Sequence, residues 1–265
     1  MDKVLHPTNR IQESLSLYRP DKGSFHSALG NSDVHVWSFP LGTSRDSLAR
    51  FESFLSNDER ERARRFHFEQ HRNHYVAGRG WLRELLGHYL DTSPEQVQFQ
   101  YGRHGKPLLS AHNSNALHFN LAHSDGIALA GVTRAGPLGL DIERIQVLED
   151  MAELVKLFFS PRENSMFQEL ELQQQLVAFF NLWTRKEAFL KATGEGISQY
   201  LKQVEVTFLP GERVRFLKLP ERFETAEKWT LKDLTVDSDF KAALAINLRD
   251  IRVHYDQWRE ENKYC

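Results

Sequence analysis

The sequence predicts an α+β fold made of two similar subdomains within one chain. Three observations support this: an order of strand, helix and further strands recurs on both sides of residues 135–137, each helical region begins with the same Ser-x-x-Glu spacing, and 265 residues suit two domains of ordinary size. Hydrophobic residues make up 40% of the chain and charged residues 26%, as in globular proteins. A duplicated unit of about 110 residues accounts for these observations together.

The first unit is expected over residues 33–135. Alternating apolar and polar residues predict a strand from Val34, and a helical region follows from about Phe54 to Leu90. Ser56 and Glu59 have the spacing of a capping box. Further strands are expected at 97–101 and 127–132.

The second unit is expected over residues 136–252. Its strand at 138–145 precedes a second capping-box pair, Ser160 and Glu163, and a helix that ends at Gly194. Further strands are expected at 204–208 and 243–248. Polar segments at 1–32 and 253–265 are expected to be terminal tails.

Charge and cysteine content narrow the protein class. The formal net charge of −2 gives no overall attraction to nucleic acid. Cys265 is the only cysteine, so no intramolecular disulfide forms, and this suits a reducing compartment. Neither a signal peptide nor an apolar run long enough for a membrane span occurs in this sequence. A cytoplasmic location is expected.

Two carboxylates share one face of the strand at 138–145. Leu138, Leu140 and Ile142 alternate with Asp141 and Glu143, whose side chains lie on the other face. Adjacent carboxylates repel each other, and a divalent cation with oxygen ligands neutralises them. A solvated outer face explains the same pattern, so Asp141 and Glu143 alone do not identify a metal site.

Charged residues also enter the apolar face of the helix that ends at Gly194. On a helical wheel, Lys186 falls inside an arc of aromatic and leucine side chains, Glu187 lies at its edge, and Lys191 follows one turn later. An unpaired buried charge is costly, so Lys186 and Glu187 indicate a site. A snorkelling lysine and an i, i+4 ion pair are the alternatives. Glu187 is expected to add a third carboxylate, and the lysines are expected to face an anion.

Three segments together resemble the successive motifs of 4′-phosphopantetheinyl transferases, of the larger pseudodimeric type that activates polyketide, nonribosomal peptide and fatty-acid carrier proteins. The segments are Phe119-Asn120-Leu121-Ala122-His123-Ser124, Gly139-Leu140-Asp141-Ile142-Glu143 and Trp183-Thr184-Arg185-Lys186-Glu187-Ala188-Phe189-Leu190-Lys191, with Gly105-Lys106-Pro107 before them. The resemblance covers roughly residues 50–210. It implies two α+β halves with the active site in the cleft between them.

The resemblance implies the following chemistry. Phosphopantetheine moves from coenzyme A to a serine hydroxyl of an apo carrier protein, and 3′,5′-adenosine bisphosphate leaves. Asp141, Glu143 and Glu187 would hold Mg²⁺, with Glu187 as the base, and Asp141 and Lys191 as further catalytic residues. Such positioning and charge neutralisation suit phosphoryl-type transfer.

The resemblance also implies the coenzyme A contacts. Lys106, Pro107, His123 and Ser124 would bind the cofactor, with His123 at the 3′-phosphate. Lys186 and Lys191 are expected at the phosphates. Ala122 stands where the family often has Ser or Thr, and Gln70 where relatives commonly have an arginine, so Arg72 or Arg79 is expected to compensate.

A chain with both halves is expected to act as a monomer. Two alternatives to the enzyme remain open from the residues alone: a catalytically silent module that binds coenzyme A or a carrier, and a Mg²⁺-dependent phosphotransferase with another pyrophosphate substrate. Arginines outnumber glutamates between Arg60 and Arg83, which favours either a solvated helix or a docking surface for an acidic carrier. His67, His71 and His74 share a helical spacing but lack a ligand set for a transition metal.

Overall fold

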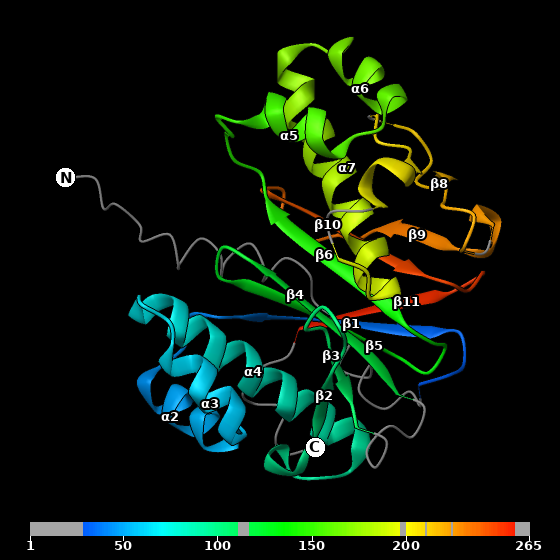
Figure 1. Cartoon of the computed structure of the whole chain (residues 1–265). Coiled ribbons are helices and arrows are strands. Elements are labelled where there is room, and N and C mark those ends of the chain that lie inside the picture. The colour runs from blue at the N-terminus through cyan, green and yellow to red at the C-terminus, as the bar shows by residue number, and fades with distance from the viewer. Residues whose placement is uncertain (1–28, 111–116, 197–199, 210, 224, 258–265) are drawn as a thin grey trace.

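The computed structural model describes residues 29–110, 117–196, 200–209, 211–223 and 225–257. Residues 1–28 of the tail expected at 1–32 lie outside these ranges, and so does Cys265. Figure 1 shows the arrangement of the elements along the chain.

Within the described residues, the N-terminal half contains three helices, one 3₁₀ turn and five strands. They are β1 (Asp33–Pro40), α2 (Arg45–Phe54), α3 (Asn57–Arg64), α4 (Glu69–Leu90), η3 (Pro94–Gln96), β2 (Phe99–Tyr101), β3 (Pro107–Leu109), β4 (His118–Ser124) and β5 (Ile127–Thr133). The predicted helical region from Phe54 to Leu90 is thus α3 and α4 with a break at 65–68. Helix α2, which Ser44 caps by accepting from Ser47 N, precedes the predicted start.

The C-terminal half repeats this order and adds a final strand. Its elements are β6 (Leu138–Arg144), α5 (Met151–Phe158), α6 (Pro161–Gln168), α7 (Leu172–Thr193), η4 (Leu201–Gln203), β7 (Glu205–Val206), β8 (Phe216–Lys218), η5 (Ala226–Lys228), β9 (Thr230–Asp233), β10 (Phe240–Ile246) and β11 (Arg252–Gln257). Gly194, with φ of +75°, ends α7 in the left-handed conformation that glycine adopts at low cost.

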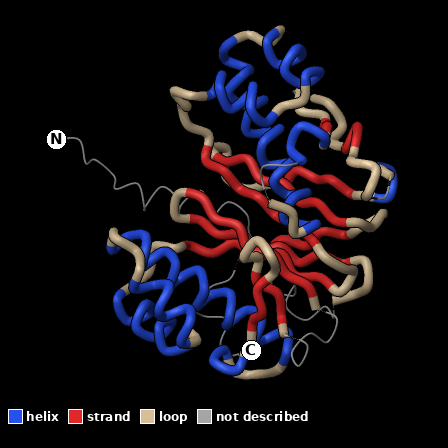
Figure 2. Tube along the Cα trace, viewed as in Figure 1, coloured by secondary structure: helices blue, strands red, loops and turns tan. Residues whose placement is uncertain are grey.

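Two sheets pack face to face between two layers of helices. One sheet has the order β11-β1-β5-β4 and the other β6-β10-β9. Apolar side chains from both sheets form the core between them, including Val36, Leu129, Leu140 and Leu244. Helices α2, α3 and α4 lie on the outer side of the first sheet, and α7 lies on the outer side of the second (Figures 1 and 2). The predicted α+β fold with two similar halves is confirmed.

Both predicted capping boxes form, and both glutamates are buried. Ser56 N donates to Glu59 Oε2 at 3.0 Å, and Ser160 N donates to Glu163 Oε2 at 2.8 Å. Each glutamate is 1% exposed, because each also accepts from cations of the long helix of its half. The repeated Ser-x-x-Glu spacing therefore marks a buried polar anchor as well as a helix start.

The expected tail from residue 253 is wrong for its first five residues. Arg252–Gln257 form β11, which pairs in parallel with β1, and Asp33 aligns with Arg252. Val253 and Tyr255 pack against the core between the sheets, and Arg252 Nε donates to Asp33 Oδ1 at 2.7 Å. The alternation of Val253 and Tyr255 with polar residues was the available strand signal. The C-terminal strand thus completes the sheet of the N-terminal half.

Candidate active site

Helix α7 lies directly on strand β6 at Gly139. A Cβ atom on Gly139 would be 2.0 Å from Ala188 O and 2.3 Å from Ala192 N, so the contact requires a residue without a side chain. Side chains two apart on a strand share a face, so Asp141 lies on the same side of β6 as this contact. Asp141 therefore lies against the last turns of α7 rather than in solvent.

Asp141 is almost completely buried and only partly paired. Its Oδ1 accepts from Lys191 Nζ at 2.6 Å, while its Oδ2 is buried without a hydrogen-bond partner. Burial raises the pKa of Asp141, and the Lys191 ammonium opposes that rise. The solvated outer face considered from the sequence is therefore excluded for Asp141, which is 3% exposed.

Glu187 brings a second under-coordinated carboxylate to Asp141. Its Oε1 is buried without a hydrogen-bond partner. Burial is the main cause that raises the pKa of Glu187 to about 7, and the charge of Asp141 and, more weakly, that of Glu143 add to it, while Lys191 opposes it. The three carboxylates predicted from the sequence thus interact with one another.

Side chains of strand β4, from the N-terminal half, form hydrogen bonds with the unpaired edge of β6. Asn120 Oδ1 accepts from Leu140 N at 2.7 Å, and Ser124 Oγ accepts from Arg144 N at 3.1 Å. Ser124 Oγ also donates to Glu143 Oε2 at 3.1 Å. An edge strand leaves backbone N–H groups to be satisfied, and these side chains satisfy two of them. Ser124, predicted as a cofactor contact, is thus directed to Glu143 and the β6 backbone.

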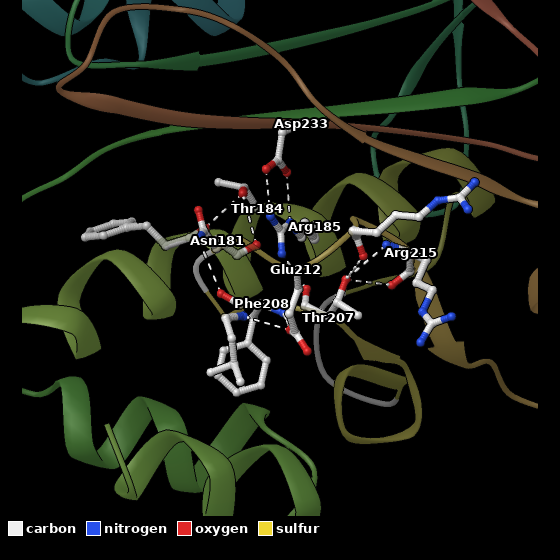
Figure 3. Close-up of polar contacts among 11 residues, drawn as sticks. Asn181, Thr184, Arg185, Thr207, Phe208, Glu212, Arg215 and Asp233 are labelled. Atoms are coloured by element: carbon white, nitrogen blue, oxygen red, sulfur yellow. Dashed lines mark hydrogen bonds and ion pairs between the residues drawn. The ribbon is translucent and has the colours of Figure 1, made fainter. Parts of the chain in front are cut away.

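Two cations next to Glu187 in sequence anchor α7 to the rest of its half. Arg185 donates Nε and one terminal nitrogen to the Asp233 carboxylate, at 2.8 and 2.6 Å, and its other terminal nitrogen to Thr207 O (Figure 3). Lys186 Nζ donates to Glu163 Oε2 at 2.5 Å and to Leu201 O at 2.7 Å. These contacts fix the rotation of the helix that carries Glu187.

The expectation that Lys186 faces the phosphates of the cofactor is therefore wrong. Its side chain is 1% exposed, and its ammonium is neutralised by the buried Glu163. The helical wheel placed Lys186 on the apolar face correctly, but the buried capping-box glutamate that receives it lies 23 residues away in sequence.

Arg72 and Arg79, the arginines predicted to compensate for Gln70, form ion pairs with glutamates of the protein instead. Arg79 and Arg83 both pair with the buried Glu59, and Arg72 pairs with Glu52 at 2.7 Å. Arg79 is 6% exposed. The arginines of this region therefore divide by burial: Arg79 and Arg83 are buried, Arg60 and Arg72 are half-buried, and the exposed members are Arg62, Arg64 and Arg65.

The imidazoles of His123 and His74 lie near each other, and His123 also lies near Lys191. Burial lowers the pKa of His123, and the nearby Lys191 and His74 lower it further. His74 lines a groove of about 350 Å³ together with Gln70, Asn73 and Thr43. Polar side chains of this kind near the Lys191 ammonium suit an anionic ligand.

Lys106 lies between the two halves. Its Nζ donates to Leu138 O at 3.0 Å and to Lys191 O at 2.5 Å. Pro107 follows it as the first residue of β3 and is partly buried. The Lys106 ammonium is thus directed at backbone carbonyl groups of β6 and α7.

The carboxylates suit a hard divalent cation in their chemistry. The buried, unpartnered Asp141 Oδ2 and Glu187 Oε1 offer oxygen ligands and carry charge that a cation would neutralise. Within the described ranges, no three or more His, Cys, Asp or Glu side chains form a ready-made metal site. Mg²⁺ commonly takes one or two carboxylates and completes its coordination with water and substrate phosphates, so such a cation does not require a complete protein cage.

Comparison with known families covers both halves of the chain. The model of the 4′-phosphopantetheinyl transferase superfamily matches residues 137–245, and the model of the N-terminal region of 4′-phosphopantetheinyl transferases matches residues 42–134. The chain belongs to the 4′-phosphopantetheinyl transferase family. Members of this family transfer phosphopantetheine to carrier proteins, and the resemblance seen in the sequence motifs is confirmed.

Individual relatives extend the similarity over most of this transferase. The 4′-phosphopantetheinyl transferase HetI of Nostoc sp. is 40% identical over 82% of the chain and 88% of its own length. The 4′-phosphopantetheinyl transferase Sfp of Bacillus subtilis is 27% identical over 76% of the chain and 86% of its own length. The human L-aminoadipate-semialdehyde dehydrogenase-phosphopantetheinyl transferase is 24% identical over 83% of the chain and 77% of its own length.

The structure shows the roles of two residues of this phosphopantetheinyl transferase that the sequence alone did not indicate. Asn120 stands inside a recognised motif, yet its contact to Leu140 N depends on β4 and β6 lying side by side. Gly139 opens the Asp-x-Glu motif, and its closeness to α7 becomes visible only in three dimensions. Of the two departures noted in the sequence, Ala122 is buried in the core between the sheets, whereas Gln70 lines the groove beside His74.

Proposed function

We propose that this enzyme transfers 4′-phosphopantetheine from coenzyme A to a serine hydroxyl of an apo carrier protein, with Mg²⁺, and releases 3′,5′-adenosine bisphosphate. One observation supports this most strongly: Asp141, Glu143 and Glu187 interact electrostatically beneath the end of α7, and two of them have buried oxygens without partners. The Lys191 ammonium lies at the same place.

Asp141, Glu143 and Glu187 would hold the cation, which when bound neutralises charge on the pyrophosphate of coenzyme A. Lys191 is available to contact the phosphates because its side chain is 32% exposed, although Nζ pairs with Asp141 in this structure. A cation at Asp141 would compete with that ion pair. The Lys191 ammonium, released from Asp141, would then contact the phosphates of coenzyme A.

Glu187 acts as the base in this proposal. Burial and like charges raise its pKa to about 7 in the metal-free chain, and a bound cation would favour the ionised form, which accepts a proton. The serine Oγ forms a bond to the β-phosphorus as its proton passes to Glu187. The bond from that phosphorus to the oxygen of 3′,5′-adenosine bisphosphate breaks.

The nucleotide end of coenzyme A is assigned to the region of His123 and Pro107. His123 would bind the 3′-phosphate, supported by its proximity to His74 and by the groove that His74 lines. A bound phosphate favours the protonated imidazole and so raises its lowered pKa. Ser124 would support the site by holding Glu143.

The carrier protein is assigned to the exposed side of α3 and the segment after it. Arg62, Arg65, Phe66 and Tyr101 line a groove of about 650 Å³ there, together with the carboxylates of Asp58 and Glu61. Arg64 and Phe68 are exposed in the same segment. Basic charge beside apolar rings suits an acidic protein partner with apolar contact residues.

Since one chain supplies both halves of the site, we assign the activity to a cytoplasmic monomer. None of the described helices is long and apolar enough to span a bilayer.

Mass spectrometry of an apo carrier protein incubated with the enzyme, coenzyme A and Mg²⁺ tests this proposal. We expect each carrier to gain the mass of one phosphopantetheine group on its serine, and a serine-to-alanine carrier to stay unmodified. An enzyme that binds coenzyme A without changing the carrier would be a silent binding module. Transfer only from another pyrophosphate compound would identify a different phosphotransferase.

A further inference from the structure

Lys106 makes contacts that connect the two halves at the site. Its Nζ donates to Leu138 O, at the start of β6, and to Lys191 O, in the last turn of α7. Lys106 itself belongs to the N-terminal half, in the turn between β2 and β3. The turn is closed by Gly102 N donating to Lys106 O, and Gly105 adopts φ of +77° there.

The acceptor on α7 is a carbonyl group that needs a donor. The last four carbonyl groups of a helix have no intrahelical partner, and Lys191 O is among them because α7 ends at Thr193. The N–H groups of both Gly194 and Glu195 bond to Leu190 O instead. A lysine at a helix C-terminus also interacts favourably with the helix dipole.

The two acceptors lie on the elements that carry the carboxylates. Leu138 is three residues before Asp141 on β6, and Lys191 is one helical turn after Glu187 on α7. Ala188 and Ala192 of the same turn already contact Gly139. The Lys106 ammonium therefore joins β6 and α7 where they approach most closely, from outside both elements.

We propose that Lys106 is a positioning residue that holds the end of α7 against β6, and so sets the geometry of Asp141, Glu187 and Lys191. It acts through those residues rather than as a ligand of the nucleotide. The inference rests on the function proposed above. It departs from the nucleotide contact that the family resemblance implies for Lys106.

The surroundings of Lys106 support this assignment. Burial is the main cause that lowers the pKa of Lys106 to about 8, and the nearby Lys191 ammonium adds to it. A buried ammonium group is unfavourable unless it is paired, and the two carbonyl acceptors of Lys106 indicate a structural role for it. Its removal leaves Lys191 O without this donor and removes a contact that holds the last turn of α7 against β6.

The test compares Lys106→Met, which keeps the aliphatic stem, with Lys106→Arg, which keeps a charged donor. Lys218→Met is the matched control, because Lys218 is exposed on β8 of the same chain. Three quantities are measured for each full-length variant: amide hydrogen exchange over residues 188–196, the Kd for 3′,5′-adenosine bisphosphate without Mg²⁺, and kcat with its Mg²⁺ dependence.

Lys106→Met is expected to exchange about 10–100-fold faster at the Gly194 and Glu195 amides, since hydrogen bonds to charged groups stabilise by roughly 1.5–3 kcal/mol. Exchange in β9 and β10 should not change. The kcat should fall about 10–100-fold with a higher Mg²⁺ requirement, because small displacements of catalytic groups have effects of that size. The Kd for 3′,5′-adenosine bisphosphate should stay within about twofold, as for a residue that does not contact the nucleotide. Lys106→Arg should recover most of the exchange protection.

A different result overturns the assignment. If Lys106→Met weakens 3′,5′-adenosine bisphosphate binding about tenfold and leaves exchange at the end of α7 unchanged, Lys106 is a nucleotide ligand. A failure of the proposed function looks different: the wild-type enzyme would then modify no carrier, while the exchange comparison would still report whether Lys106 holds α7.

Discussion

The two halves of the chain place different side chains at equivalent positions beneath their long helices. Ala130 and Ala128 of β5 pair with Trp37 and Phe39 of β1, while Ala245 and Ala243 of β10 pair with Gly139 and Asp141 of β6. Trp37 and Phe39 fill the core under α4. In the other half, glycine admits the α7 backbone and aspartate adds a charge. The same framework therefore forms an apolar core in one half and holds a buried charge against the long helix in the other.

The long helices show the same division. Arg83 of α4 and Lys186 of α7 both reach the buried capping-box glutamate of their half. The following residue is a glutamate in each helix. Glu84 forms an ion pair with Arg50, whereas Glu187 lies beside the like charges of Asp141 and Glu143, and burial and these charges raise its pKa. The anchoring ion pair is thus kept in both halves. In the C-terminal half the next carboxylate instead lies among like charges, and a bound cation would neutralise them.

The largest effect is expected on transfer activity in Asp141→Ala. Removal of one ligand of a charge-neutralising site should lower kcat at least about 100-fold at ordinary Mg²⁺. The free energy of unfolding without Mg²⁺ should stay the same or increase, because the variant relieves repulsion with Glu187. Carrier modification followed by mass spectrometry and urea denaturation measure the two quantities; near-normal transfer would exclude Asp141 from the metal site.

Phe39→Asp makes the reciprocal change in the N-terminal half. Phe39 is fully buried against Trp81, so the new carboxylate would lack both water and a cation. We expect a loss of roughly 3–5 kcal/mol in stability, against no loss for Asp141→Ala. Equal stability effects at the two positions would mean that the halves do not differ as described.

Gly139→Ala is expected to have a smaller effect on the same contact. The added methyl group forces α7 away from β6, which should lower stability by about 1–3 kcal/mol and reduce transfer about 10–100-fold. Gly78→Ala in α4 is the control, since its Cβ would meet only Leu41 Cδ2 at 3.4 Å. The control should be neutral or gain stability from helix propensity. An active, stable Gly139→Ala protein would contradict the close packing.

Glu187→Gln should remove a pH dependence of stability in the metal-free protein. The pKa of Glu187 is about 7 in the folded chain against an ordinary value of 4.5, so the folded state holds the extra proton between these values. The free energy of unfolding should therefore fall as pH rises from about 4.5 to 7, by on the order of 1–3 kcal/mol.

The measurement is urea denaturation in the presence of a chelator across that pH range. Glu187→Gln should make the curve less steep, because glutamine does not titrate, while Asp141 and Glu143, whose pKa values are also raised, still do. Glu84→Gln loses the ion pair with Arg50 instead, and we expect it to be less stable than the wild type at pH 8. An unchanged slope in Glu187→Gln would assign the titration to another group.

The smallest effect is expected from charge reversal on the exposed arginines. Transfer at subsaturating acidic carrier should fall as salt rises, and Arg62→Glu or Arg64→Glu should weaken that dependence and lower kcat/KM by about two- to tenfold at low salt. The KM for coenzyme A should not change. Arg213→Glu, an exposed change in the other half, is the control. A wild-type salt slope in both variants would show that the carrier docks elsewhere.

Local patterns in the sequence were sufficient to predict the duplicated fold. The Ser-x-x-Glu pairs, the alternating strands and Gly194 act over a few residues, so they could be recognised without the structure. The helical wheel likewise placed Glu187 near the buried face. Each of these features depends on neighbours in sequence.

Partners that lie far apart in sequence could not be assigned in the same way. Arg79 looked available for a phosphate because Glu59, which neutralises it, is 20 residues away and had been explained by its capping role. Lys186 was misassigned for the same reason with Glu163. The buried charges were recognised as unusual, but whether a ligand or a protein group compensates each one depends on tertiary packing.

The pairing of β11 with β1 has a consequence for synthesis of the protein. Asp33 and Arg252 align across the sheet although 219 residues separate them. While the ribosome is still translating the second half, β1 has no neighbour on that side and presents an open row of backbone groups. The sheet of the first half can therefore be completed only after β11 has left the ribosome.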